Sequence, residues 1–215
     1  MYLPRHFEQA RADVLQAFIR AHPLAALVTT DADGTGLDAN HIPLILRPDQ
    51  GPHGRLLGHV ARANPLWQRA AGGIACLAIF QGTQGYISPN HYASKRETGK
   101  VVPTWNYDVV HVHGTLRAID DVAWLRDFVT TLTNTHEAQQ PVPWKVTDAP
   151  ADYVDRMLTA IVGIEVDIAR MVGKAKLSQN QPQANRESLV AALRAAGDSA
   201  SVEMADAVEE HSPRG

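Results

Sequence analysis

The sequence predicts a mainly β fold, a small antiparallel barrel with peripheral helices. About six segments have the composition or the two-residue alternation of strands. Turn residues or short helical excursions connect most of these segments, which favours antiparallel pairing. Strands and helices do not alternate regularly along the chain, as they would in a doubly wound parallel sheet. With 215 residues, the chain has the length of one large domain.

Helices are predicted at both ends of the chain and in one insertion. An amphipathic helix opens the fold, because Phe7, Val14 and Phe18 recur at heptad-like spacing before Pro23. A short helix is expected at residues 64–72, with Asn64 as its N-cap and a proline at the first helical position. Apolar spacing predicts further helices over residues 125–132, 153–164 and 185–197.

The predicted strands cover residues 24–30, 37–47, 55–60, 74–80, 109–116 and 164–168. The first two form a hairpin, because residues 31–34 between them have turn composition. The run 74–80 is apolar throughout, as is typical of a fully buried strand. We expect residues 1–197 to form the domain. Residues 198–215 are acidic and rich in Ser and Ala, and we expect them to be a weakly ordered tail.

Composition excludes several classes of protein. The formal net charge of −3 gives no global field that would attract nucleic acid. The single cysteine, Cys76, rules out a disulfide framework and favours a reducing compartment. The first residues lack the pattern of a secretion signal, and no apolar run approaches the length that crosses a membrane. We therefore expect a cytoplasmic protein without membrane association.

The segment from Gly58 to Pro65 predicts an anion site. A strand ends there, Arg62 follows, and a capped helix begins at once at Asn64. The free N–H groups of a helix start, the positive end of its dipole and a guanidinium together suit a phosphate. A solvated arginine beside an ordinary N-cap is the alternative interpretation.

Two later segments indicate a planar ligand. Residues 86–92 and 103–107 are dense in aromatic and amide side chains, which can form flat walls with a few polar groups. An aromatic core corner or a subunit interface explains them equally simply. Residues 174–180 carry two lysines and three hydrogen-bonding side chains, which could bind a phosphate or the polar edge of a ring. A solvated strand end is the commoner explanation of such a run.

The ten histidines raise the possibility of a metal. His111 and His113 share one face of a strand, and His41, His59 and His91 are further candidates. No cysteine pair, metalloprotease motif or companion carboxylate supports them, so we assign no metal ligand. The sequence also lacks a P-loop and a dinucleotide-binding glycine motif.

Taken together and in order, these segments resemble the PaiB-type family of FMN-binding negative transcriptional regulators, within the FMN-binding split-barrel superfamily that contains pyridoxamine phosphate oxidases. The resemblance runs from residue 1 to about residue 190. The matching stretches are Met1-Tyr2-Leu3-Pro4 with Phe7, Asn40-His41-Ile42-Pro43, the turn from His59 to Trp67, Tyr86-Ile87-Ser88-Pro89-Asn90-His91-Tyr92, Lys100-Val101-Val102-Pro103-Thr104-Trp105-Asn106-Tyr107, His111-x-His113-Gly114 and Lys176-Leu177-Ser178-Gln179-Asn180.

The resemblance implies a six-stranded antiparallel FMN-binding split barrel that forms a homodimer, with two FMN molecules at the subunit interface. Carried onto this sequence, the phosphate-binding turn is His59, Ala61, Arg62 and Asn64, and the neighbouring strand Asn40, His41 and Ile42 borders the ring. The resemblance also implies that the later segments close over the flavin, from the same subunit or from its partner. Those residues are Trp105, Asn106, Lys176, Gln179 and Asn180.

Three functions follow as expectations. The first is a negative transcriptional regulator of the PaiB type, acting on DNA directly or through a protein partner, although no helix-turn-helix is legible. The second is a flavin-dependent oxidoreductase acting on an amine, a polyamine or a vitamin-like substrate, because His41, His91, Tyr92 and Lys95 are expected near the ring. The third, which we rank last, is haem or metal handling by the strand histidines. Whether the protein is an enzyme is left open.

Overall fold

The computed structural model describes residues 1–212. The chain divides into two compact units, each built from several segments. The first unit contains Met1–Phe18, Gln81–Val110 and the described part of Val172–Gly215, and the second contains Ile19–Phe80 and His111–Met171. Across the described residues, no helix has both the length and the apolar character that crossing a membrane would require.

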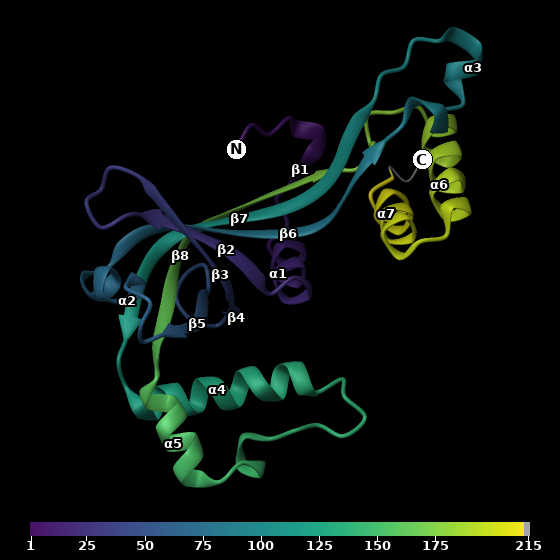
Figure 1. Cartoon of the computed structure of the whole chain (residues 1–215). Helices are drawn as coiled ribbons and strands as arrows, with labels where there is room; N and C mark the ends of the chain where they lie inside the picture. The colour runs from purple at the N-terminus through teal and green to yellow at the C-terminus, as the bar shows by residue number, and fades with distance from the viewer. Residues whose placement is uncertain (213–215) are drawn as a thin grey trace. The chain divides into compact units, whose positions relative to one another are not determined.

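The fold is mainly β, as the sequence predicts, and its sheet has eight strands (Figure 1). The hydrogen-bonded order is β3-β2-β6-β7-β8-β5-β4, and β1 pairs with β8. The β2–β3, β2–β6, β4–β5, β5–β8 and β1–β8 pairs are antiparallel. The strands are β1 (Glu8–Gln9), β2 (Leu24–Thr30), β3 (Leu37–Pro43), β4 (Ile45–Arg47), β5 (Arg55–Ala61), β6 (Ile74–Ile87), β7 (Thr104–Ile119) and β8 (Ile161–Lys176).

The prediction of six strands is wrong for two reasons. The two-residue strand β1 has too little sequence to show a pattern. The predicted strand 37–47 is two strands, because β3 pairs with β2 whereas β4 pairs with β5. The change of partner occurs at Leu44, whose N–H donates to the Pro23 carbonyl at 2.9 Å. The two ends of the open sheet, β3 and β4, are therefore joined by a single residue.

Three strands, β6, β7 and β8, are longer than their apolar runs suggested, and β7 covers Thr104–Ile119 where the prediction was 109–116. β6 continues through the glycine-rich stretch after Phe80 and ends at Ile87. A Cβ on Gly82 would lie 2.8 Å from the Phe18 ring, so glycine lets the strand pass close to that side chain. β8 begins at Ile161, and the predicted helix 153–164 therefore stops early, at Thr159.

In the second unit, the helices are α2 (Leu66–Arg69), the 3₁₀ turn η2 (Ala70–Gly72), α4 (Val122–Glu137), η4 (Val146–Asp148) and α5 (Ala151–Thr159). Asp121 caps α4 by accepting a hydrogen bond from the Trp124 N–H at 2.9 Å. Leu125, Val154 and Leu158 form a small apolar cluster that holds α4 against α5. Figure 1 shows these two helices as one neighbouring pair.

The first unit contains η1 (Arg5–Phe7), η3 (Pro89–His91), α3 (Ser94–Thr98), α6 (Gln183–Ala196), α7 (Ser199–Glu210) and most of α1 (Ala12–Ala21). The opening helix thus begins later than Pro4, because η1 and β1 precede it. α6 and α7 lie side by side (Figure 1), and their apolar side chains pack with Ile87 and Leu177 of the sheet.

The prediction of a weakly ordered tail is wrong for residues 199–210, which form α7. Asp198 caps this helix by accepting from the Ser201 N–H at 2.9 Å. Met204, Ala205 and Val208 are buried against α6. Few large apolar residues mark the segment, and they suffice because α6 supplies the partner surface. The last three residues of the predicted tail, 213–215, lie outside the described part of the chain.

Candidate functional site

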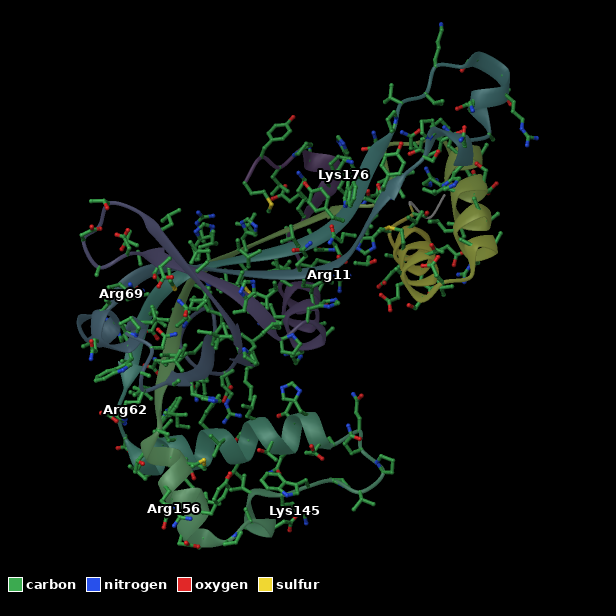
Figure 2. All side chains as sticks on the ribbon, in the orientation of Figure 1. Arg11, Arg62, Arg69, Lys145, Arg156 and Lys176 are labelled. Carbon is green, nitrogen blue, oxygen red and sulfur yellow. The ribbon has the colours of Figure 1, made fainter. Side chains whose placement is uncertain are left out.

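The turn after β5 places Arg62 where the sequence predicts an anion site. Arg62 is labelled in Figure 2. Its guanidinium makes a two-pronged contact with Asp120, from Nη1 to Oδ2 at 3.0 Å and from Nη2 to Oδ1 at 2.6 Å. Nε donates to the Thr159 carbonyl at 2.7 Å, and Nη2 also donates to the Ile161 carbonyl at 3.1 Å. Four of the five guanidinium N–H groups are therefore used within the chain. Arg62 therefore fastens the end of β5 to Asp120 before α4, to the last residue of α5 and to the first residue of β8.

The ion pair of Arg62 and Asp120 shifts the pKa of both residues toward their charged forms. Hydrogen bonding to Asp120 raises the pKa of Arg62, and the same contact lowers the pKa of Asp120 below its ordinary value. Both side chains are partly exposed, at 38% and 50%. A phosphate that approaches Arg62 from solvent would compete with the Asp120 carboxylate for the same N–H groups.

The predicted helix start is one turn long. The N-cap of α2 is Pro65, one residue later than predicted, and Asn64 Oδ1 accepts from the Leu66 N–H at 3.0 Å. α2 itself has four residues and passes directly into η2, and the chain then turns at Gly73, whose φ is 83°. A single turn aligns too few peptide groups for a strong helix dipole, so the dipole part of the expected anion site finds no support here.

A second cation lies beside Asn40 and Asn64, and sequence reasoning missed it. Arg69 of α2 donates from Nη2 to Asp38 Oδ2 at 2.6 Å, and this contact lowers the pKa of Asp38 (Figure 2). Asn40 donates to the same carboxylate oxygen at 3.3 Å and accepts from Asn64 Nδ2 at 2.7 Å. The Arg69 Nε is buried and has no hydrogen-bond partner among the described residues. The alternation of Asp38 and Asn40 on one strand face was the available signal.

The other predicted residues of the second unit divide by exposure. His41 and Ala61 are exposed, whereas Ile42 is buried in the core. His59 packs edge-on against Phe128 of α4 with ring centroids 5.8 Å apart, and burial lowers its pKa. Packing in the core accounts for the positions of His59 and Ile42. Only the exposed His41 and Ala61, and the cluster of Asn40, Asn64 and Arg69, therefore offer groups to a ligand.

In the first unit, the structure brings together residues from β7 and from the end of β8. Asn106 is buried and exchanges hydrogen bonds with the Ser178 hydroxyl at 3.0 and 3.3 Å. Gln179 folds back on its own strand, accepting from the Leu177 N–H at 2.8 Å and donating to the Ala175 carbonyl at 2.7 Å. These amides therefore shape the strand end, and Asn180 beyond them is exposed.

Trp105 and Lys176 lie on the other face of these strands. Trp105 Nε1 donates to Gln84 Oε1 at 3.2 Å, and its ring meets Tyr86 edge-on at 6.2 Å. Lys176 Nζ donates to Thr104 Oγ1 at 2.5 Å and to the Trp105 carbonyl. Lys174, which the predicted site did not include, lies two residues before Lys176 and so on the same strand face.

Three of the residues expected near a substrate, His91, Tyr92 and Lys95, lie on one segment of the first unit. Tyr92 is buried against the α6–α7 cluster, and Lys95 Nζ donates to Asn90 within the same loop. The Ser188 hydroxyl donates to the His91 carbonyl at 2.7 Å, so this segment is fastened to α6. His41 belongs to the second unit. His41 is exposed, so it is available to a ligand.

The histidine pair forms no recognisable metal centre. The His111 and His113 rings are tilted by 55°, with centroids 6.5 Å apart, and burial lowers the pKa of both. Within residues 1–212, no group of three His, Cys, Asp or Glu side chains is placed to hold a metal ion. Burial also raises the pKa of the Cys76 thiol to about 11, so that thiol is neutral near pH 7.

The match to a family model defines the class of this protein as FMN-binding. The chain belongs to the family described as "Putative FMN-binding domain", whose model matches residues 1–170. The resemblance to the PaiB-type family is thereby confirmed, and FMN is the cofactor that this membership assigns.

Relatives cover nearly the whole chain. An uncharacterized protein of Emericella nidulans is 30% identical, over 98% of this chain and 97% of its own length. The Bacillus subtilis protein named "Protease synthase and sporulation protein PAI 2" is 26% identical, over 98% of this chain and 97% of its own. Among solved structures, the FAD and haem binding protein of Mycobacterium smegmatis superposes with a TM-score of 0.58 at 16% identity, covering 79% of this chain and 73% of that one. The last likeness concerns the fold alone.

The donor set of the second unit fits a flavin phosphate. A phosphate needs N–H donors with positive charge, and the Asn40–Asn64–Arg69 cluster offers amides together with a buried guanidinium N–H that has no partner among the described residues. Arg62 retains one free N–H on Nη1 and is held in place by its other contacts.

Proposed function

We propose that the protein is a homodimeric FMN-binding flavoprotein that acts as a negative transcriptional regulator of the PaiB type. Membership of the FMN-binding family over residues 1–170 is the observation that carries the flavin part. The regulatory part is supported by the Bacillus subtilis relative, which matches 98% of this chain and is named "Protease synthase and sporulation protein PAI 2".

The phosphate of FMN is proposed to bind at the turn that follows β5. His59 and Ala61 lie at the end of β5, and Arg62 and Asn64 follow it in the turn. Asn40, His41 and Ile42 belong to β3, and Asn40 accepts a hydrogen bond from Asn64. The buried Nε of Arg69, without a hydrogen-bond partner among the described residues, supports this location, because a phosphate oxygen would satisfy it. When FMN is bound, its ring supplies the redox chemistry. The chain's own residues orient the phosphate and exclude water from it.

The ring is proposed to meet the second set of predicted residues, which includes Trp105 and Lys176 as direct contacts. Asn106, Gln179 and Asn180 complete this set, and the first two hold the strand end in shape through the hydrogen bonds described above.

Comparison of FMN with riboflavin tests the phosphate contact, because the two differ only in the phosphate. Arg62→Ala should weaken FMN binding about tenfold or more, the effect of one charge-assisted hydrogen bond or two, and leave riboflavin binding unchanged. Arg156→Ala is the matched control, since Arg156 is an exposed arginine of the same unit that pairs with Asp152. Fluorescence titration with each flavin gives both dissociation constants.

Equal losses for the two flavins would show that Arg62 only fastens the fold, and they would move the phosphate elsewhere. Titration of Arg69→Ala with both flavins would then show whether the phosphate binds beside Arg69 and Asp38 instead. A protein that is purified colourless and takes up neither flavin would contradict the flavin proposal altogether.

The regulatory proposal is tested with DNA. Light scattering of the FMN-loaded protein should give the mass of a dimer. A mobility-shift titration over the protein's own promoter region should show a sequence preference that changes when FMN is removed. Binding that lacks sequence preference at low salt would contradict direct repression. Bleaching of the bound flavin by NADPH together with a small amine would instead favour the oxidoreductase alternative.

A further inference from the structure

A small cavity lies between α4 and the strand pair β4–β5, and every residue that lines it belongs to the second unit. Its volume is about 130 Å³. Ile45, Arg47 and Leu57 form its strand side. They alternate with the buried core residues Leu46 and Leu56, so they point to the opposite side of the sheet. The cavity therefore lies on the outer face of these strands, away from the core.

One face of α4 closes the cavity. Its lining residues follow one another at intervals of three and four positions, which brings their side chains to a single side of the helix. They are Trp124, Asp127, Phe128 and Thr131. The Trp124 and Phe128 rings are stacked, with centroids 5.2 Å apart and planes tilted by 12°. The helix thus contributes an aromatic wall, one carboxylate and one hydroxyl.

Arg47 brings a positive charge to this cavity. Its side chain is half-buried and forms neither a hydrogen bond nor an ion pair with any described residue. Its Nε is buried, again with no hydrogen-bond partner in the described part of the chain. Arg55 stands directly opposite in the β4–β5 register and contacts both Glu165 and Asp167. Because a guanidinium removed from water is ordinarily paired, Arg47 lacks the acceptor that such a group needs.

A negative charge lines the same cavity. Asp127 is exposed, and within residues 1–212 its carboxylate forms no ion pair, with Arg47 or with any other cation. The Thr131 hydroxyl donates to the main-chain carbonyl of Asp127 at 2.9 Å and leaves the carboxylate oxygens unoccupied. Arg47 and Asp127 thus bring opposite charges to one cavity while their charged atoms remain more than 4.0 Å apart.

The charges and the volume together define a class of ligand. Liquid water takes about 30 Å³ per molecule, so the cavity has room for about four waters, or for an organic molecule of about four to six non-hydrogen atoms. A molecule with a carboxylate at one end and an ammonium at the other would pair with Arg47 and Asp127 at once. The aromatic rings beside Asp127 also favour an ammonium group.

We propose that this cavity binds a small zwitterion, an α-amino acid with a short side chain such as alanine. The carboxylate of the ligand contacts the Arg47 guanidinium, and its ammonium contacts the Asp127 carboxylate. Its short apolar side chain packs against Ile45 and Leu57. Bound in this way, the ligand joins α4 to β4.

This site is separate from the proposed flavin contacts. Arg47 pairs with Arg55, the first residue of β5, whereas Arg62 follows the last residue of that strand. At about 3.3 Å per strand residue, the two positions are on the order of 20 Å apart along β5. His59 reaches Phe128 without lining the cavity itself. The proposed zwitterion site and the proposed phosphate site therefore lie at opposite ends of β5.

The test compares L-alanine with two molecules that each lack one of its charges. Propionate has the carboxylate without the ammonium, and L-alaninamide has the ammonium without the carboxylate. NMR titrations of the full chain near pH 7 give the three dissociation constants. The Kd of L-alanine should be at least about tenfold lower than that of either probe, because each probe loses one charge-assisted contact.

Each charge of the cavity is then removed by itself. Arg47→Gln should abolish the preference for L-alanine over L-alaninamide, which depends on the carboxylate contact, and should keep the preference over propionate. Asp127→Asn should have the reverse effect. Both variants should fold as the parent protein does, because neither charged group forms an ion pair among the described residues.

Arg156→Gln and Asp152→Asn are the matched controls. These two residues are exposed, pair with each other on α5 and belong to the same unit as the cavity, and Arg156 is labelled in Figure 2. Both variants should bind L-alanine, propionate and L-alaninamide as the parent protein does. Circular dichroism confirms that each variant is folded before it is titrated.

Two results overturn the inference. In the first, L-alanine binds no more tightly than propionate and L-alaninamide. In the second, Arg47→Gln and Asp127→Asn both keep the two preferences of the parent protein, which would place the ligand elsewhere. Either result leaves the flavin proposal intact, because FMN uptake is measured separately and is assigned to other residues. If the protein takes up no FMN, the proposed function fails, and the same titrations on the flavin-free protein still decide the inference.

Discussion

Two pairs of cations in this protein carry the same formal charge and have opposite surroundings. Arg62 and Arg69 of the second unit each contact an aspartate, at 2.6 Å in both cases. Lys174 and Lys176 of the first unit contact carbonyl and hydroxyl oxygens and aromatic rings, without a carboxylate. A compensated cation stabilises the fold and must exchange partners to bind an anion. A cation without a carboxylate partner can bind an anion without giving up an ion pair. The comparison shows that the neighbouring residues decide the role of a charged side chain.

The largest effect should come from the core behind the lysines. Leu177 lies between Lys176 and Ser178, is fully buried, and packs with residues of α6 and α7 that all belong to the first unit. Leu177→Ala should lower the free energy of unfolding by about 2–5 kcal/mol. Hydrogen exchange should show the lost protection in residues 172–208. Equal loss in α4 and α5 would show that the two cation pairs lie in one cooperative unit, and the comparison between separate regions would break down.

Removal of each charge should have effects of different sign. Lys174→Met keeps the length of the side chain and removes a buried charge without a carboxylate partner, so the free energy of unfolding should stay within about 1 kcal/mol of the parent or rise. Arg62→Met should lower it, because Asp120 and two carbonyl groups lose their donors. Urea denaturation of both variants measures the contrast. A lower stability for Lys174→Met than for Arg62→Met would reverse our interpretation of the two pairs.

The smallest effects should appear in the pH dependence of stability. The pKa of Asp120 is lowered in the folded protein, so its contribution is present above the unfolded value near 3.8 and is lost as the pH falls through the folded value. Asp120→Asn should flatten the stability curve in that acid range.

In the alkaline range, the pKa of Lys176 is lowered from 10.5 in the folded protein. The unfolded chain therefore binds the proton of this ammonium group more tightly than the folded protein does. Stability from this group should therefore rise with pH between the folded pKa and 10.5. Lys176→Gln should remove the rise. Chemical denaturation across the pH range measures both windows, and an unchanged profile in either variant would contradict the assignment of that pair.

Sequence reasoning succeeded where the signal was local. A short helix follows Asn64 as predicted, Asp31 to Gly34 separate β2 from β3, and α6 lies within two residues of its predicted bounds. It failed where a remote partner was needed. The division of 37–47 into two strands depends on β2 and β5 as partners, and the order of α7 depends on α6. Arg69 escaped notice because its neighbours Asp38 and Asn40 lie about thirty positions earlier in the chain.

The sequence by itself determined the family, the mainly β class and the cofactor, because these follow from residue types in order along the chain. Only the tertiary structure decided which cations are compensated. An ion pair forms between side chains that the fold brings within about 4 Å, and Arg62 finds Asp120 across 58 residues of chain. The same folding leaves Lys174 facing the Tyr2 and Tyr107 rings, and within residues 1–212 neither Lys174 nor Lys176 forms an ion pair with an acid.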